Sequence, residues 1–413
     1  MSTVDERLMA AGSFTLDLDP GTPERIKGLS DEAFMQVVVT GCRVDADALS
    51  VADLLGLARY SGVYRKRSRD RCRWEGAGLA VMLGDEDGKG NTYTGPLTPA
   101  ARPLYDGGTN TSVIRNNVLR AGGGGVNGLS AGTIPSASTP TKEINIEAGD
   151  SPRDVLDFAC DVFTTSGSNP YEWRINPDGT LDVNVRNTLF PTTATPTCLA
   201  TRDTFALGVQ SSSVDLLPVT RFDQIDDWED WSSEVVAVGP TVTVFGSEYT
   251  FSGTATIGSN PYDDVAGGEL DMRRVVTVNK STSNSQNASI ATRKLGRFDD
   301  VDRRPSLSTD LFDPGDVCRP GDSIWLFDAD TACYSLSTQV DGGAGLVFPL
   351  AVRVQGMSWP IRDGMGVYAV VGGSSGTATD LSDWVVFDEG DARLDLGEPR
   401  RQLSPRLPRW LPA

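Results

Sequence analysis

The most chemically distinctive stretch of this 413-residue sequence is rich in arginine and aromatic side chains. From Arg59 to Glu75 it carries seven basic and two acidic residues, with aromatic residues among them. Arginine interleaved with aromatics is a composition that binds single-stranded nucleic acid. If the stretch were one strand, alternate positions would share a face, and that face would hold Arg65, Arg67, Arg69, Arg71 and Arg73.

Two other interpretations of this stretch remain open. Ser68-Arg69-Asp70 can turn a hairpin, which would place the arginines on a solvated or subunit-facing surface. The arginines could instead pair with carboxylates of an acidic neighbour, because the planar guanidinium matches a carboxylate well. The balance of the chain opposes nucleic-acid binding, since 37 basic and 56 acidic residues give a net charge of −19, which repels phosphate.

Catalytic and metal chemistry lack their usual residues here. The sequence contains no histidine, which removes the commonest general base, triad member and metal ligand. No CxxC pair occurs, so we expect small buried apolar residues rather than a disulfide framework or a zinc site at Cys42, Cys72, Cys160, Cys198, Cys318 and Cys333. The sequence therefore predicts no catalytic, cofactor or metal site.

Three weaker candidates for a functional site are better explained as ordinary turns, loops or strand positions. Residues 84–91 (GDEDGKGN) resemble a calcium loop, but Lys89 replaces an oxygen ligand and no glutamate follows at the twelfth position. Residues 122–125 are four glycines with no Gly-Lys-Ser/Thr after them, unlike a phosphate-binding loop. Glu172 and Asp182 could form the carboxylate pair of a glycoside hydrolase, but their alternation with apolar residues predicts outward-facing strand positions.

A capped helix is predicted after residue 150. Ser151 is a suitable N-cap, Pro152 fits the first helical position and Asp154 the third. The helix would bury one apolar stripe, made by Val155, Leu156, Ala159, Val162 and Phe163. Asp154, Asp157 and Asp161 recur on the other side, so we expect a solvated stripe or a contact with a partner.

A tight hairpin is predicted directly after this helix. Trp173 and Ile175 alternate with Arg174, and apolar residues alternate with polar ones again over 181–185. Asn-Pro-Asp-Gly at 176–179 joins the two strands with typical turn residues. A second turn, Arg319-Pro320-Gly321-Asp322, is expected to lead into a strand at 324–327.

The fold class expected is mainly β with α+β insertions, arranged as two β-barrel-like domains with a small inserted α/β domain. We predict a first β domain at 1–92, the inserted domain at 93–190, a second β domain at 191–372 with a helix near 285–295, and a C-terminal extension at 373–413 in which Trp410 is a possible anchor on a neighbour. Other expected elements are strands at 14–18, 33–40, 78–83 and 144–146, a helix at 109–120, and either a helix or strands at 48–60.

The charged N-terminus, and the absence of an apolar run of about 20 residues, predict a soluble protein without membrane insertion.

Several stretches resemble one family when taken in order along about 300 residues of the chain. They lie in 60–90, at Ser151–Asp154, in Glu-Trp-Arg-Ile-Asn-Pro-Asp-Gly at 172–179, in Pro-Gly-Asp-Ser-Ile-Trp at 320–325 and at 354–366. In this order they resemble minor tail proteins, or tail-tip (baseplate) hubs, of long-tailed phages of actinobacteria. The resemblance implies two β-barrel-like domains with inserted modules, and no catalytic residues.

The resemblance also implies partners and a location. A hub of this family would be a homotrimer in the virion, assembled in the host cytoplasm and placed at the tail tip. It would join the tail tube and distal tail protein to the tape measure protein and to a tail fibre or central spike, and phage DNA would pass it without specific binding. Two other functions stay open: a tail-associated cell-wall hydrolase, and a receptor-binding or carbohydrate-binding tail module.

Overall fold

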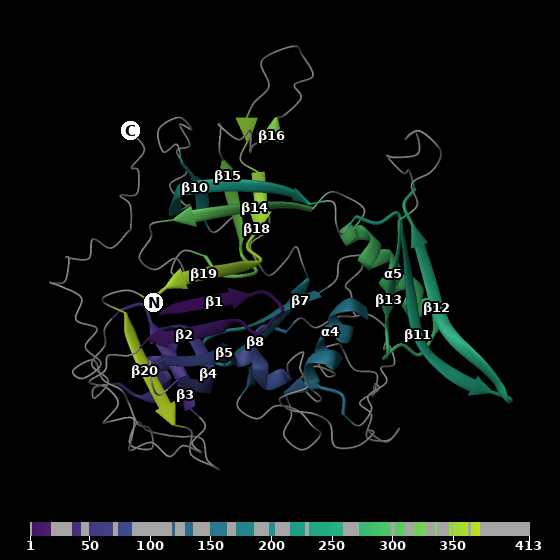
Figure 1. Cartoon of the computed structure of the whole chain (residues 1–413), viewed down its shortest axis with the longest axis horizontal. Helices are drawn as coiled ribbons and strands as arrows, with labels where there is room; N and C mark the ends of the chain where they lie inside the picture. Colours follow the sequence, from purple (N-terminus) through teal and green to yellow (C-terminus); the bar gives the residue numbers. More distant parts are fainter. Residues whose placement is uncertain are drawn as a thin grey trace.

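The structure is a computed structural model, and within the residues that it describes the chain is mainly β (Figure 1). Those residues are 2–17, 35–42, 49–68, 73–84, 118–119, 129–134, 149–162, 171–185, 198–202, 215–227, 231–258, 272–298, 302–309, 318–327, 335–336, 347–348, 350–361 and 365–371. The expected strand at 144–146, the helix at 109–120 apart from 118–119, and the extension from 373 lie outside them.

The largest sheet is antiparallel throughout and combines the N-terminal region with residues from the end of the described chain. Its order is β19 (Gly356–Pro360), β1 (Thr3–Arg7), β2 (Ser13–Asp17), β5 (Arg73–Gly78), β4 (Ala58–Ser68), β3 (Met35–Thr40) and β20 (Gly366–Val371). Strands β19 and β20 fall within 191–372 in sequence, yet they pair with β1 and β3. Segments more than 300 residues apart therefore complete one sheet.

One face of this sheet forms a closed apolar core. Phe14 and Leu16 point into it from β2, as their alternation predicts, and Trp74 lies opposite Leu16 in the register. Gly76 is required beside Phe14, because a Cβ there would lie 2.3 Å from the aromatic ring. Trp359 of β19 is buried in the same core, so the returning strand contributes packing as well as hydrogen bonds.

Of the arrangements left open for the arginine-rich stretch, the hairpin is confirmed, because β4 ends at Ser68 and pairs there with Arg73 of β5. The conditional single strand with five arginines on one face does not form, and one other expectation in this region needs revision. The expected strand at 78–83 is a 3-10 helix, η2 (Leu79–Leu83). A short continuous apolar run shows neither the alternation of a strand nor the spacing of a helix, so it is compatible with either structure when buried. Residues 48–60 hold both alternatives: a short helix, α2 (Val51–Gly56), and then the start of β4.

A second sheet mixes parallel and antiparallel neighbours. Its order is β14 (Asp302–Thr309), β10 (Asp215–Asp227), β9 (Cys198–Thr201), β15 (Ser323–Phe327) and β18 (Leu350–Arg353), and a separate pair is formed by β16 (Ser335–Leu336) and β17 (Val347–Phe348). Cys198 and Cys318 are buried in its core as free thiols, and Cys160 is buried elsewhere in the fold, which confirms the expectation for these three. For Cys42 the expected burial is wrong, because its thiol is free but exposed, and Cys72 and Cys333 lie outside the described residues. Strand β10 was not predicted, because Pro218 and its charged residues interrupt the alternation.

The predicted helix and hairpin lie together in one small α/β unit. Helix α4 (Pro152–Val162) is followed by β7 (Tyr171–Ile175) and β8 (Thr180–Val185), with the short β6 (Ser130–Ala131) beside β8. The turn at 176–179 closes as expected, with Gly179 at φ +82°. Val155, Leu156 and Ala159 are completely buried, which confirms the predicted apolar face at these positions; the side chains of Val162 and Phe163 lie outside the described part.

A third sheet carries its own helix. Strands β12 (Ser247–Thr256), β11 (Glu234–Val244) and β13 (Arg273–Thr277) lie side by side, and α5 (Asn284–Phe298) packs on one face (Figure 1). The helix expected near 285–295 is thereby confirmed. Residues of this unit, of α4 with its hairpin and of η2 share one apolar cluster.

Candidate functional site

Each aspartate of the predicted acidic stripe on α4 has a partner within the chain. Asp154 completes a capping box: its carboxylate accepts from the Ser151 backbone N–H at 2.9 Å, and its own N–H donates to the Ser151 hydroxyl at 3.1 Å. Asp161 forms an ion pair with Lys294 of α5 at 2.9 Å. Asp157 accepts a 2.6 Å hydrogen bond from the indole N–H of Trp173. Asp154 therefore caps α4, whereas Asp157 and Asp161 hold the helix to neighbouring elements.

Asp157 has the most unusual electrostatic environment of the three. Desolvation raises the pKa of its carboxyl to about 6, and the nearby Asp161 adds to this, while the Trp173 hydrogen bond, Arg153 and Lys294 act in the opposite direction. The Arg153 guanidinium lies 3.5 Å away, and 40% of the Asp157 side chain remains exposed. Because that exposure lets water screen the charge, we expect the raised pKa to change the stability of the protein only slightly.

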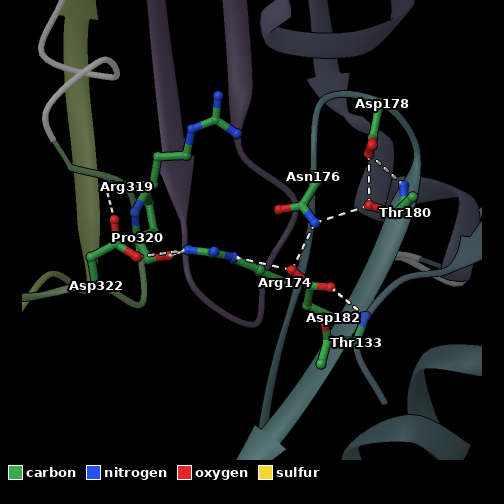
Figure 2. A network of polar contacts seen from close by, with 9 residues as sticks. All are labelled: Thr133, Arg174, Asn176, Asp178, Thr180, Asp182, Arg319, Pro320 and Asp322. Atoms are coloured by element: carbon green, nitrogen blue, oxygen red, sulfur yellow. Dashed lines mark hydrogen bonds and ion pairs between the residues drawn. The ribbon is translucent and has the colours of Figure 1, made fainter. Parts of the chain in front are cut away.

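The hairpin β7–β8 anchors a polar network that reaches another part of the fold (Figure 2). Asp182 of the hairpin accepts from the Asn176 amide at 2.7 Å and, from the segment after β6, the Thr133 backbone N–H at 2.7 Å. Asp178 accepts from both the N–H and the hydroxyl of Thr180. These contacts fix the turn and place Arg174 beside Asp182, at 3.7 Å.

Arg174 carries this network across to the turn that precedes β15. Its Nη1 donates to Asp322 Oδ1 at 2.9 Å and to the Pro320 carbonyl at 3.3 Å (Figure 2). Asp322 also accepts from the Arg319 backbone N–H at 2.9 Å, and Gly321 between them adopts φ +97°. The tight turn at 319–322, expected from the sequence, is thus confirmed and presents a carboxylate to the hairpin.

Arg174, Arg319 and Asp322 were not singled out as site residues from the sequence. The alternation at 171–175 places Arg174 on the polar side of its strand, and Pro-Gly indicates a turn at 320–321. Neither signal identifies a partner 148 residues away, because that proximity is produced only by the fold.

A small pocket of about 60 Å³ lies beside this junction. Its lining includes Glu6 of β1, Tyr60 and Ser61 of β4, and both Arg174 and Arg319. Burial raises the pKa of the Tyr60 phenol well above its ordinary value, and Glu6 adds to this; burial lowers the pKa of Arg319. Among the described residues, the Tyr60 and Ser61 hydroxyls have no hydrogen-bond partner.

The size of this pocket limits what it can accept. Pockets for drug-sized ligands usually measure roughly 300–1,000 Å³, whereas 60 Å³ suits water molecules or one small polar group. The nominal hydrolase residues fit poorly too: Glu172 is buried, and Asp182 is engaged by Arg174, Asn176 and Thr133. The arrangement is suited to holding parts of the chain together rather than to turning over a sugar.

The remaining predicted contact residues fall in two groups. Arg73 is half-exposed and forms ion pairs with Glu75 at 3.2 Å and Asp17 at 3.9 Å. Arg65 and Arg67 lie on β4 with side chains outside the described part, and Arg69, Arg71 and Trp410 lie outside it altogether. Their proposed role in subunit contacts stays a prediction.

Within the described ranges, no group of three acidic or cysteine residues is placed to hold a metal ion. In the same part of the chain, none of the helices combines the length and the apolar character needed to cross a membrane.

Comparison with known proteins gives distant structural likenesses. No family model matches the sequence, and no curated protein matches it. The 43 kDa tail protein of prophage MuSo2 from Shewanella oneidensis is similar in structure at 12% identity and a TM-score of 0.45, over 90% of this chain and 93% of that one. A tail protein from Neisseria meningitidis MC58 (15% identity, TM-score 0.40, 90% and 87% covered) and prophage tail protein gp18 from Listeria monocytogenes EGD-e (11%, 0.38, 91% and 89%) are also similar. A functional inference has to come from the chain's own residues.

Proposed function

We propose that this chain is a structural protein of a phage tail, and more specifically a hub ring at the tail tip. The observation that carries the proposal is the junction between Arg174 and Asp322. Each residue lies in a stretch that resembles the hub family, at 172–179 and 320–325. The Arg174–Asp322 contact joins these two stretches. The resemblance therefore includes residues that hold distant parts of the fold together.

The mechanism proposed for the hub is geometric and electrostatic. Extensive antiparallel sheets give a rigid wall, and three copies would close it into a ring around the channel. Acidic residues supply the net charge of −19, and on the inner wall of the ring they would repel DNA phosphates and let the genome pass without sticking. The unit of α4 with its hairpin would present outer surface to neighbouring tail proteins.

The partners follow from this position. We infer that the hub contacts the distal tail protein on the tube side, the end of the tape measure protein, and a tail fibre or central spike on the other side. It would be assembled in the host cytoplasm and carried in the virion. The proposal requires no enzymatic step and no cofactor.

Cryo-electron microscopy of particles carrying a tagged copy of this chain tests the proposal. A threefold ring of tagged density at the tail tip is expected. Tag density elsewhere on the particle, or a chain that is absent from particles, would rule out the hub. Clearing of host peptidoglycan by the purified protein in a zymogram would also contradict the structural role.

A further inference from the structure

Exposed apolar side chains are concentrated on one unit of this protein. Among the described residues, six large apolar side chains are exposed, and Leu57, at the end of α2, is the only one of them outside the β11–β13 sheet and its immediate flank. The other five are Val244, Phe245, Tyr249, Met272 and Val275. Single exposed apolar residues are ordinary, but a cluster on one element marks an interaction surface.

The tip of the β11–β12 hairpin holds the most prominent of these residues. Phe245 is fully exposed and has φ +51°, followed by Gly246 at +82°. Turns with two positive φ values favour Asn, Asp or Gly at the first position, and a bulky residue there is strained. An aromatic side chain at this place gains no packing within the described fold, so its apolar surface is available to another chain.

The hairpin presents this tip rigidly. Figure 1 shows β11 and β12 running past α5 to the edge of the molecule. Tyr249 packs edge-to-face on Phe251 with ring centroids 5.6 Å apart, and its hydroxyl accepts a hydrogen bond from the side-chain amide of Asn284 at the start of α5. Tyr249 lies only three residues after Gly246 of the turn, so α5 holds the hairpin close to its tip and fixes the direction in which Phe245 projects.

The same sheet offers an apolar face that matches such a tip. Val235 and Ala237 of β11 are buried in the cluster that includes Ile290 of α5, so Val236 lies on the opposite face. In the parallel register Val236 is paired with Val275 of β13, which is exposed. Aliphatic side chains therefore occupy adjacent strands on the face that α5 does not cover.

The charge distribution identifies the occupant. Residues 231–298 contain six acidic and six basic side chains, so the whole net charge of −19 lies elsewhere in the chain. Two copies of this protein repel each other across their acidic surfaces and are least opposed where both are neutral. A basic partner would instead be attracted to the acidic remainder. The neutral, apolar sheet is suited to a second copy.

We propose that one copy inserts Phe245 onto the Val236–Val275 face of a second copy. Because the tip and the face are different surfaces, the contact is heterologous and can repeat until a ring closes. The proposal goes beyond a tail-tip function, since it names the surface through which copies meet and can be examined on the isolated protein.

Self-association of the purified full chain tests this contact. Mass measurement by light scattering across a concentration series should give a species larger than the 44.1 kDa chain. Phe245→Ser should weaken association at least about tenfold, and Val275→Ser should weaken it in the same direction. Leu57→Ser removes an exposed apolar residue elsewhere and should leave association unchanged.

A photocrosslinking amino acid at position 245 identifies the surface directly. With a mixture of light and 15N-labelled chains, mixed-isotope crosslinks between 245 and the peptide around 275 are expected. A wild-type protein that stays monomeric, a Phe245→Ser variant that associates as tightly as wild type, or crosslinks confined to one chain would overturn the proposal. These results do not depend on where the protein lies in a particle. The contact between copies can therefore fail or hold independently of the proposed hub position, which the microscopy of particles tests.

Discussion

Arg174 Nη1 donates a 2.9 Å hydrogen bond to Asp322 Oδ1 across 148 residues of sequence. Both side chains are mostly buried, with exposed fractions of 24% and 13%. A charged pair in such a place is costly to break from one side, because the remaining charge keeps its desolvation without its partner. The contact couples the β7–β8 hairpin to the turn that precedes β15.

Arg174→Met is expected to lower the free energy of unfolding by about 2–3 kcal/mol, measured by urea denaturation. Arg273→Met is the matched control: Arg273 also pairs with a carboxylate, Glu234, at 2.5 Å, but is 65% exposed, so its loss should cost less than about 1 kcal/mol. Equal costs for the two variants would show that burial does not govern the Arg174 contact.

Asp157 should make stability depend on pH in an unusual direction. Its folded-state pKa is raised to about 6, so the folded protein holds the proton more tightly than the unfolded chain does. The stabilisation is complete below the ordinary carboxyl pKa and is lost as pH rises to about 6. Because the side chain is 40% exposed, we expect an effect of at most about 1 kcal/mol.

Asp157→Asn removes this titration and keeps an acceptor for the Trp173 indole. The melting temperature of the variant, relative to wild type, is therefore expected to increase as pH is raised from about 4 to about 6. Because both proteins contain all the other carboxyl groups, the titration of those groups cancels when the two melting temperatures are subtracted. Parallel melting curves across this range would mean that Asp157 titrates normally.

Ser151→Ala should destabilise the protein by about 1 kcal/mol. The hydroxyl accepts from the N–H of Asp154 at 3.1 Å and contacts the Asp154 carboxylate at 2.8 Å, and alanine leaves that first-turn donor without a side-chain acceptor. Ser151→Thr keeps a hydroxyl at the same position and should recover most of the loss. Thermal unfolding of the three proteins checks this, and a full loss in Ser151→Thr would exclude capping as the cause.

Gly253→Ala should destabilise the β11–β13 unit by about 1–3 kcal/mol. A Cβ at Gly253 would lie 2.1 Å from the backbone nitrogen of Ala288, so β12 and α5 would have to separate. Gly258→Ala is the control, because nothing lies within 4 Å of its Cβ position. Hydrogen exchange in α5 should rise for the first variant only, and unchanged exchange in both would show that the interface can relax.

Gly296→Ala is expected to act in the opposite direction. Gly296 lies in the last turns of α5, and an added Cβ there meets nothing within 4 Å. Alanine costs less backbone entropy in a helix, so stability should rise by about 0.5–1 kcal/mol. A lower melting temperature would indicate that this end of α5 is not helical in solution.

Local features of this protein were readable from its sequence. The capping box at Ser151, the turn at 176–179 and the helix at 284–298 depend on neighbouring residues, and residue type and spacing determine them. The mainly β character also follows from short alternating segments. The apolar run at 79–83 shows the limit, because without a period it predicts a strand as readily as the 3-10 helix that forms.

Long-range relationships were decided by the tertiary structure alone. Strand β19 completes the first sheet because its backbone groups form hydrogen bonds with those of β1. The two strands begin at Thr3 and Gly356, 353 residues apart, and nothing in either local sequence indicates that they pair. The predicted acidic stripe of α4 shows the same principle: its residues were recognised, but Trp173 and Lys294 as partners were not. Sequence spacing specifies which groups share an element's face, whereas packing of distant elements selects the groups that they meet.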